Sequence, residues 1–367
     1  MFESLVSALK HDCGRSLAAS TVRLLLSAGL IGLAMPAEAQ SPQLYLGPPV
    51  EGLAVVGTKL FWKAKCDRGH PSSYIRAVEA TIPTGGGNAL GGGLLGKTLF
   101  KTPTCWPDSV GSRNLAADSH YVYYIDRYPR LVRIAHGEAA GSSPSPVRLT
   151  QVQPATGVGF VLALSPGWVA WTNGEAVFRV QSGVGPGFAV IYPLVDPGDL
   201  PPIFDLLPSG GDYIVWARDG LHRLAAPHFN LDRLSGTDAT TAFTVDGADV
   251  YAAVRTESGS YTIAKVGSDG AFLPIYTQTA SGESELVDYI LVADGMIFWH
   301  VSGEAGGPIM RMSLSRGAPA GRPVPITGDI ALSPETRLSA SAGWLLWTSA
   351  EDHRLYRLPL TAAPRPQ

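Results

Sequence analysis

Six residues have side chains suited to acid-base chemistry or ligand binding and recur at comparable places along the sequence. They are Asp126, Arg218, Asp219, His300, Asp352 and His353. Carboxylates and imidazoles can transfer protons or hold a divalent metal ion when they converge. The sequence fixes no distance between these residues, so we treat them as candidate binding residues and assign no catalytic residue, metal or cofactor. Solvated loop residues without a function are the alternative.

A glycine-rich segment matches the pattern of a phosphate-binding loop. Residues 91–98 read GGGLLGKT, in which glycine amides would cradle a phosphate and Lys97 would neutralise it. That mechanism needs a helix whose N-terminus faces the phosphates. Pro103 follows too soon for a helix, so we interpret the segment as a flexible glycine insertion. The chain has no nucleophile-elbow, zinc-protease, calcium-loop or CxxC motif.

The candidate residues are placed by a short apolar and aromatic phrase that returns seven times. The phrases are Leu60-Phe61-Trp62, Val122-Tyr123-Tyr124, Val169-Ala170-Trp171, Ile214-Val215-Trp216, Val250-Tyr251-Ala252, Ile297-Phe298-Trp299 and Leu345-Leu346-Trp347. Their third residues lie 62, 47, 45, 36, 47 and 48 residues apart, a period typical of one propeller blade per repeat. We therefore predict an all-β fold, a seven-bladed β-propeller of four-stranded antiparallel blades. The six candidate residues then lie on the face built from the loops between second and third strands.

Each repeat also has one basic residue on its expected third strand. These residues are Arg76, Arg133, Arg179, Arg223, Lys265, Arg311 and Arg357. A charge that recurs in every blade indicates a structural role, in which the side chain binds a carbonyl or carboxylate of the neighbouring blade. The Trp residues are expected to pack between blades, with the indole N–H bonded to a partner.

The last repeat ends without an outer strand of its own. Residues 43–46, Gln-Leu-Tyr-Leu, have the composition of an outer strand and precede the first innermost strand. Pairing them with the last blade would close the ring and remove an open sheet edge. We therefore predict a ring closed by an N-terminal strand.

The N-terminus has the pattern of an export signal. Lys10, Arg15 and Arg23 precede an apolar run over residues 24–35, which is followed by Ala37-Glu38-Ala39. This predicts a signal peptide over 1–39, because the apolar run is shorter than the roughly 20 residues that cross a bilayer. Residues 40–367 are then one propeller domain with a first-blade insertion at about 80–112. We expect a monomer in the periplasm or outside the cell, with no membrane span after cleavage.

Two cysteines follow the signal, Cys66 and Cys105. An even pair in an exported protein predicts one disulfide, and two unpaired thiols are the alternative. The two residues follow the expected second and fourth strands of the first blade. Alternating strands end on the same face of a blade, so the two loops can bring the thiols together.

The charge of the chain argues against nucleic acid as a partner. The formal net charge is −3, and charged residues make up 16% of the sequence. Nucleic-acid binding depends on clustered Lys and Arg that neutralise phosphates. The 42 Gly and 29 Pro are instead suited to many tight turns between short strands.

Two repeats resemble those of a known family. Ala170-Trp171-Thr172-Asn173 with Phe178-Arg179-Val180, and Leu346-Trp347-Thr348-Ser349 with Tyr356-Arg357-Leu358, are similar to the Tyr-Trp-Thr-Asp repeats of low-density-lipoprotein-receptor-type propellers and related secreted bacterial propellers. No repeat has the complete signature, and the receptor propellers have six blades. The resemblance implies a ring used mainly for binding, and it transfers no active site.

The sequence favours an exported, non-enzymatic propeller that binds a protein or glycan partner through one face. The alternative is a propeller enzyme of the lyase or lactonase type, with a metal or a His and carboxylate pair at the channel mouth. A structural part of a cell-envelope complex is a third possibility. His300, which directly follows Trp299, is the residue whose substitution best separates the enzyme from the other two.

Overall fold

The computed structural model describes most of the chain between residues 42 and 361. The described ranges are 42–46, 49–64, 74–79, 97–101, 113–126, 128–136, 145–153, 159–183, 185, 190–199, 202–234, 236–256, 260–267, 270–279, 285–303, 306–334 and 336–361. Residues 1–39 and 40–367 separate into two units, and the strands of the described ranges belong to the second. Within the described ranges no helix is long and apolar enough to cross a membrane.

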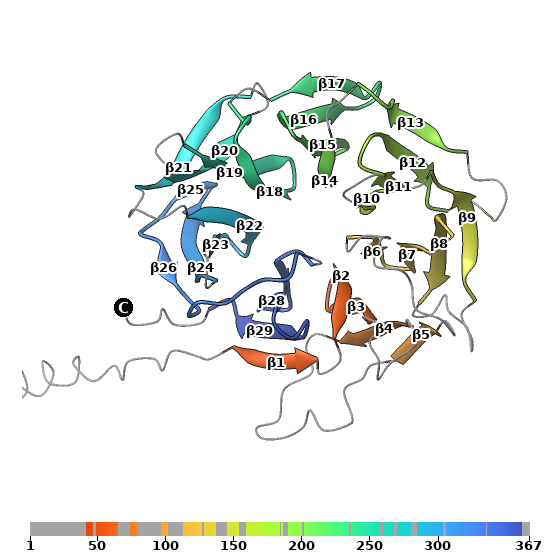
Figure 1. Cartoon of the computed structure of the whole chain (residues 1–367), viewed down its shortest axis with the longest axis horizontal. Helices are drawn as coiled ribbons and strands as arrows, with labels where there is room; N and C mark the ends of the chain where they lie inside the picture. Colours follow the sequence, from red (N-terminus) through yellow and green to blue (C-terminus); the bar gives the residue numbers. More distant parts are fainter. Residues whose placement is uncertain are drawn as a thin grey trace, which may run out of the picture. The chain divides into compact units, whose positions relative to one another are not determined.

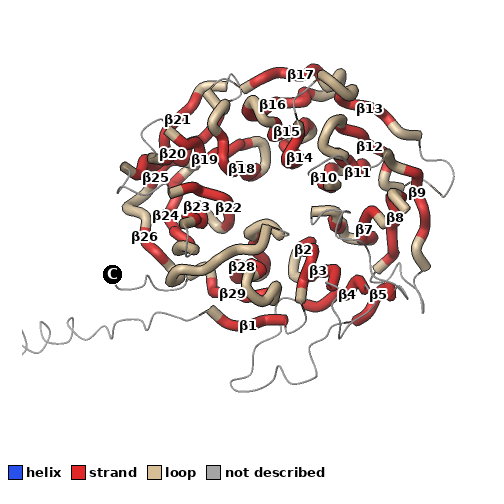
Figure 2. The backbone as a smooth tube through the Cα atoms, in the orientation of Figure 1, coloured by secondary structure: helices blue, strands red, loops and turns tan. Residues whose placement is uncertain are grey.

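Six antiparallel sheets have four strands each and form the regular blades of a β-propeller (Figures 1 and 2). Five of these sheets are continuous in sequence. From the innermost strand outward they are β2 (Val50–Val56), β3 (Lys59–Ala64), β4 (Tyr74–Glu79) and β5 (Lys97–Lys101); β6 (Leu115–Ala117), β7 (Tyr121–Ile125), β8 (Arg130–Ala135) and β9 (Val147–Gln151); β10 (Val161–Ser165), β11 (Trp168–Thr172), β12 (Val177–Gln181) and β13 (Tyr192–Val195); β14 (Ile203–Ser209), β15 (Asp212–Ala217), β16 (Gly220–Ala225) and β17 (Asn230–Arg233); and β18 (Thr240–Asp246), β19 (Asp249–Arg255), β20 (Tyr261–Val266) and β21 (Phe272–Gln278).

The sixth regular sheet joins the two ends of the propeller unit. It contains β27 (Ser339–Ser341), β28 (Trp344–Thr348), β29 (Leu355–Pro359) and, in the outer position, β1 (Gln43–Leu46). β1 runs antiparallel to β29 and lies beside it in Figure 1, with Gln43 opposite Arg357. The predicted role of residues 43–46 is therefore confirmed: an N-terminal strand completes the blade that the C-terminal strands begin.

The prediction of seven four-stranded blades is wrong, because six sheets have that form in the part of the chain that the structure describes. The remaining sheet has five strands: β22 (Leu286–Ala293), β23 (Met296–Ser302), β24 (Ile309–Ser315), β25 (Ala318–Pro319) and β26 (Val324–Pro325). Its outer position is divided, since β25 and β26 pair with different halves of β24. Pro319, Pro323 and Pro325 explain the division, because proline has no N–H to donate to a continuous ladder.

Tight turns fix the register between innermost and second strands. Asp294 and Gly295, between β22 and β23, have φ values of 50° and 69°, and Ala342 and Gly343, between β27 and β28, have 50° and 79°. Two consecutive residues with positive φ make the turn that matches the twist of a two-residue hairpin.

Four of the recurring Trp residues are buried, as predicted, but the expected partner for the indole N–H is wrong for Trp62 and Trp171, which have none among the described residues. Trp62, Trp171, Trp299 and Trp347 are all buried. Trp171 packs with Tyr123 of the preceding sheet, and the indole N–H of Trp299 donates to the Tyr261 hydroxyl across a sheet boundary at 3.1 Å. Their burial places apolar contact between neighbouring sheets.

The recurring basic residues tie neighbouring sheets at some positions and not at others. Arg133 and Arg311 donate to the carbonyls of Ser182 and Leu360, each in the next sheet. Lys265 and Arg223 instead face carboxylates of their own sheets, Asp249 at 2.6 Å and Asp212 at 3.9 Å. In three repeats, including that of Arg133, the guanidinium lies over an aromatic ring on the second strand: Arg133 over Tyr121, Arg179 over Trp168 and Arg357 over Trp344.

Candidate functional site

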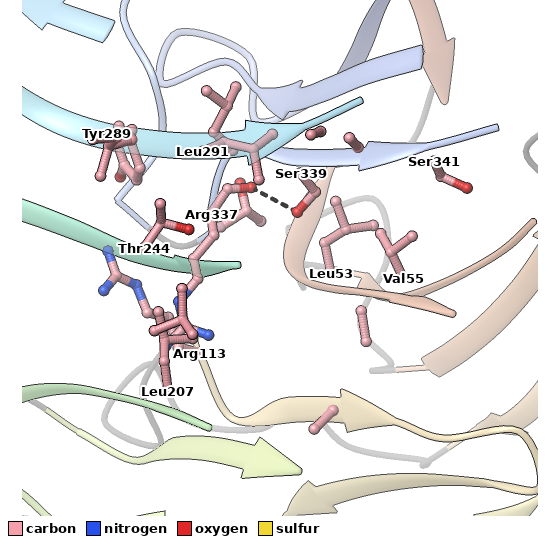
Figure 3. A pocket seen from close by; sticks show the side chains of 18 of the residues that line it. Leu53, Val55, Arg113, Leu207, Thr244, Tyr289, Leu291, Arg337, Ser339 and Ser341 are labelled. Carbon is pink, nitrogen blue, oxygen red and sulfur yellow. Dashed lines mark hydrogen bonds between the residues drawn. The ribbon is translucent and has the colours of Figure 1, made fainter. Parts of the chain in front are cut away.

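A cavity of about 820 Å³ occupies the centre of the ring and is lined by the innermost strands (Figure 3). Its apolar walls include Leu53, Val55, Leu115, Leu164, Leu207 and Leu291. Small-molecule sites commonly have volumes of about 300–1,000 Å³, apolar walls and a few convergent polar groups. The cavity has the size and lining of such a site.

One wall of the cavity carries a charged cluster from three different sheets. Arg113 precedes β6, Asp205 lies in β14 and Arg337 precedes β27. Nη1 of Arg113 donates to Oδ2 of Asp205 at 2.5 Å, and Nη2 of Arg337 donates to Oδ1 of the same carboxylate. The Leu206 amide also donates to Oδ1 at 2.7 Å, and Arg337 donates to the Leu206 carbonyl at 3.2 Å. A single buried carboxylate is thus shared by two guanidinium groups.

The electrostatics of this cluster favour the ionised carboxylate. Burial by itself would raise the pKa of Asp205, but the charges of Arg337 and Arg113 and their hydrogen bonds outweigh it and hold that pKa below its usual range. Burial raises the pKa of the neighbouring Tyr289 to about 12, so its phenol stays protonated, and it donates to the Ser333 carbonyl at 2.8 Å. Burial and the nearby Arg113 lower the pKa of Arg337, as expected where two cations share one anion.

β-bulges near the start of the innermost strands shape this end of the cavity. In β2, β14 and β22 the register shifts so that one extra residue bulges from the ladder: Glu51, Phe204 and Asp288. Each bulged residue contacts a side chain of the second strand, giving the pairs Glu51–Lys63, Phe204–Trp216 and Asp288–His300. A bulge re-aims the side chains around it. The residues after two of these bulges, Asp205 and Tyr289, line the cavity.

His300 is fully enclosed by hydrogen-bond acceptors. Its Nδ1 lies 2.6 Å from Oδ1 of Asp288, and its Nε2 lies 3.1 Å from the Gly307 carbonyl and 2.9 Å from the Ile330 carbonyl. Only glycine fits at 307, since a Cβ there would lie 1.8 Å from the Val301 carbonyl oxygen. The ring therefore joins the bulge of β22 to the backbone bridge between Gly307 and Ile330, and its side chain is 1% exposed.

The other five predicted residues lie in loops of three separate sheets. Asp126 accepts from the Arg130 side chain and from the Tyr128 amide. Asp219 lies 2.9 Å from the His222 ring, and the Arg218 amide donates to the Pro202 carbonyl at 3.1 Å.

The fifth and sixth candidates are adjacent in the loop between β28 and β29. Asp352 accepts from the Tyr356 hydroxyl at 2.9 Å, and the His353 carbonyl accepts from the Val50 amide at 2.6 Å. The six residues are therefore spread around the ring rather than gathered in one site. Among the described residues no group of three or more His, Cys, Asp or Glu side chains is arranged to hold a metal ion.

Several predicted features lie outside the described residues. They are the signal peptide, the disulfide between Cys66 and Cys105 and the glycine segment up to Gly96.

The sequence contains a signal for the charged cluster, although the predicted site residues do not include it. Arg113 and Arg337 each stand two residues before an innermost strand, β6 and β27. Asp205 interrupts the otherwise apolar run of β14, Ile-Phe-Asp-Leu-Leu. An unexplained charge in a strand that faces the centre of a ring indicates a partner across the channel. The structure supplies that partner twice.

The fold is shared with solved β-propellers. The chain superposes on a variant of puromycin hydrolase complexed with PGG with a TM-score of 0.58 at 15% identity, over 87% of this chain and 53% of that one, so it spans about half the length of the hydrolase. It matches the Swd1 β-propeller domain of Myceliophteria thermophila with a TM-score of 0.56 at 8% identity, over 87% of this chain and 100% of that one. It matches the extracellular domain of the putative one-component system BT4673 from B. thetaiotaomicron with a TM-score of 0.51 at 10% identity, over 87% and 40% of the two chains.

Sequence comparison adds no family to this likeness of fold. No family model matches the chain, and no curated protein matches it. The similarity to low-density-lipoprotein-receptor-type repeats therefore rests on the repeat residues alone.

Proposed function

We propose that this protein is a non-enzymatic binding propeller that holds its partner at the end of the channel where the innermost strands begin. The observation that carries the proposal is the Arg113–Asp205–Arg337 cluster on the wall of the central cavity. In a ring of similar sheets, function is expected where the repeat is broken by a set of residues that occurs once. This cluster is such a set, whereas the recurring Trp and Arg residues support the scaffold.

Access to the cluster supports binding rather than a purely internal tie. The side chains of Arg113 and Arg337 are 21% and 30% exposed, although their shared carboxylate is 6% exposed. A guanidinium group whose surface is partly exposed can donate a hydrogen bond to a second acceptor from outside the protein. We call the end of the cavity at which Arg113 and Arg337 lie the mouth. A protein segment or a glycan with a hydrogen-bond acceptor is the class of partner that the mouth would hold.

Closing the mouth with a bulky side chain tests the proposal. Ser339 lines the cavity beside Arg337 (Figure 3), so Ser339→Trp should fill the mouth and abolish binding of the partner. Ser313→Trp, at an exposed position of β24, is the matched control and should bind as the wild type does. Binding is measured by affinity capture from an envelope extract and on a glycan array. Equal capture by wild type and Ser339→Trp contradicts the proposal, and so does the lack of any specific partner on both.

We further propose that the protein acts outside the cytoplasm, as a monomer held by a disulfide in the first blade. The support is the signal pattern over 1–39 and the even pair Cys66 and Cys105. The mature protein should begin at Gln40 and should yield a cross-linked peptide pair under non-reducing conditions. An uncleaved N-terminus in a cell fraction containing cytoplasm contradicts export.

An enzyme is the second candidate, and the Asp288–His300 pair is the observation that favours it. A carboxylate next to an imidazole, with Asp288 on the cavity wall, is a combination used in general acid-base catalysis. The placement of Nε2 against two backbone carbonyls argues for a structural role, because it leaves that nitrogen no substrate to contact. Turnover of a lactone or uronide substrate that is lost in a folded His300→Gln variant would favour the enzyme.

A further inference from the structure

We propose that the central channel binds an amphipathic carboxylate, with its carboxylate held by Arg113 and Arg337 and its apolar body along the leucines of the innermost strands. The inference rests on the proposed function, and it names the class of ligand that the channel mouth takes. Three features of the cavity carry it: an excess of cationic donors, the position of the remaining charges and the apolar walls.

The cationic donors exceed the acceptors that the protein supplies to them. Each guanidinium has five N–H donors. The two groups share the Asp205 carboxylate, Arg337 also donates to the Leu206 carbonyl, and Arg113 interacts with the Tyr289 hydroxyl. Nε of Arg337 is buried and has no hydrogen-bond partner among the residues that the structure describes. A second carboxylate between the two side chains can accept from both and balance the remaining charge. Paired N–H donors on a planar guanidinium match the two oxygens of a carboxylate.

Asp205, Arg113 and Arg337 together carry one net positive charge, and the other acidic residues of the cavity wall are Asp288 and Asp294. Asp288 is already paired with His300, whose Nδ1 lies 2.6 Å from its carboxylate. Asp294 lies in the turn at the far end of β22, about five residues from Tyr289 and therefore roughly 16 Å along the strand. An anion entering the cavity is drawn to the end where Arg113 and Arg337 lie.

The apolar walls favour a ligand whose carboxylate is attached to an apolar body. Six leucine and valine side chains from five innermost strands face the cavity: Leu53, Val55, Leu115, Leu164, Leu207 and Leu291. A small hydrophilic anion leaves these side chains in contact with water, whereas an apolar body covers them and gains the free energy of burial. A ligand that is both anionic and apolar therefore uses the whole cavity.

Asp205 acts as an internal competitor in this arrangement. It occupies both guanidinium groups in the ligand-free protein, so the incoming carboxylate shares donors with it. Replacing Asp205 by Asn removes one negative charge from beside the site. If the cluster only stabilises the fold, Asp205→Asn lowers the stability and gives no gain in carboxylate affinity. If the cluster binds a carboxylate, Asp205→Asn raises the affinity for that carboxylate.

Calorimetric titration of the full-length mature protein with n-alkanoates tests the ligand class. From n-hexanoate to n-decanoate, affinity is expected to rise roughly threefold to fourfold for each added methylene, and acetate should bind too weakly to measure. 1-Decanol and decyltrimethylammonium should each bind at least tenfold more weakly than decanoate. Equal affinity for decanoate and 1-decanol overturns the assignment of the carboxylate to the two arginines.

Variants then connect the binding to the named residues. Arg337→Gln should lower the affinity for decanoate at least tenfold, since it removes a charge-assisted hydrogen bond. Arg148→Gln, the same change at an exposed position of β9, is the control and should bind as the wild type does. Asp205→Asn should raise the affinity. Thermal melts confirm that each variant is folded, and Arg113→Gln replaces Arg337→Gln if the latter does not fold. Unchanged affinity in the arginine variants overturns the proposal.

A competition experiment with peptides shows whether the carboxylate belongs to the end of a protein chain. An acetylated Ala-Leu-Leu peptide with a free C-terminal carboxylate should compete with decanoate if a protein chain end is the source, and the same peptide with a C-terminal amide should not. Competition by both peptides contradicts carboxylate recognition. If decanoate does not bind while Ser339→Trp still abolishes partner capture, this inference fails and the proposed function stands. If decanoate binds while Ser339→Trp captures the partner normally, the proposed function fails and the inference stands.

Discussion

At the scale of single residues, one buried ion pair forms at a bulge of an innermost strand, between Glu51 and Lys63. Lys63 is fully buried and its Nζ lies 3.1 Å from Oε2 of Glu51, which is 7% exposed. The pair lies beside Val50, whose amide donates to the His353 carbonyl of the last regular sheet. A buried ion pair is costly to break, because removing one partner leaves the other as an uncompensated charge.

Lys63→Met should therefore destabilise the fold strongly. The expected loss is about 3–5 kcal/mol in the free energy of unfolding, measured by urea denaturation. Lys265→Met is the matched control, because Lys265 and Asp249 form a partly exposed pair, 26% and 47% exposed. Exposed pairs contribute about 0–1 kcal/mol. Equal losses in the two variants would show that burial is not what makes the Glu51–Lys63 pair important.

The sequence predicted the scaffold residues better than the site residues, for a physical reason. The recurring Trp and Arg residues can be recognised in the sequence because they repeat, and their packing depends on neighbours at a fixed spacing. Asp205 and Arg337 are 132 residues apart, and their contact depends on how a whole ring closes. The sequence offers His300 as a candidate binding residue, but its partners at Gly307 and Ile330 follow from a loop path that no local pattern predicts.

At the scale of elements, the repeat predicts the positions of the strands. The prediction fails where prolines interrupt an outer strand. The five continuous regular sheets and the N-terminal outer strand follow from the period and from alternating apolar residues. The sheet that begins with β22 departs from the pattern, because prolines at 319, 323 and 325 interrupt its outer edge. Bulges are also invisible in the pattern, since one extra residue shifts which side chains face the channel.

The N-terminal strand β1 gives the prediction that belongs to this scale. Deleting residues 40–48 should lower the melting temperature, because β29 loses its antiparallel partner and becomes an exposed edge. Replacing the same nine residues by a Gly and Ser segment should have a similar effect, since such a segment has little tendency to form a strand. Differential scanning calorimetry measures both. An unchanged melting temperature in the deletion variant would rule out β1 as the closing strand.

At the scale of the whole molecule, Asp205 links sheets that are distant in sequence. It joins the sheet that begins with β14 to Arg113 before β6 and to Arg337 before β27. Contacts between adjacent sheets are mostly apolar, whereas this cluster reaches across the centre. The same carboxylate therefore restrains the ring and occupies the arginines that we propose bind the ligand, so stability and affinity should respond to it in opposite directions.

The acid sensitivity of the fold should depend on this carboxylate. The pKa of Asp205 is held below its usual range, with the two arginines outweighing the effect of burial. A carboxylate with a lowered pKa stabilises the folded state above its unfolded-state pKa of about 3.9, and this contribution is lost as the pH falls through the lower folded-state value.

At neutral pH, Asp205→Asn should therefore cost about 3 kcal/mol, because two partly buried cations lose their shared partner. The difference in melting temperature between wild type and Asp205→Asn should be constant from pH 7 to about 5 and should shrink as the pH falls below about 4. Asp238→Asn, at a side chain that is 71% exposed, should show little difference from wild type at any of these values. A gap between wild type and Asp205→Asn that stays the same at pH 3 would mean that the cluster holds the ring by packing and not by the charge of Asp205.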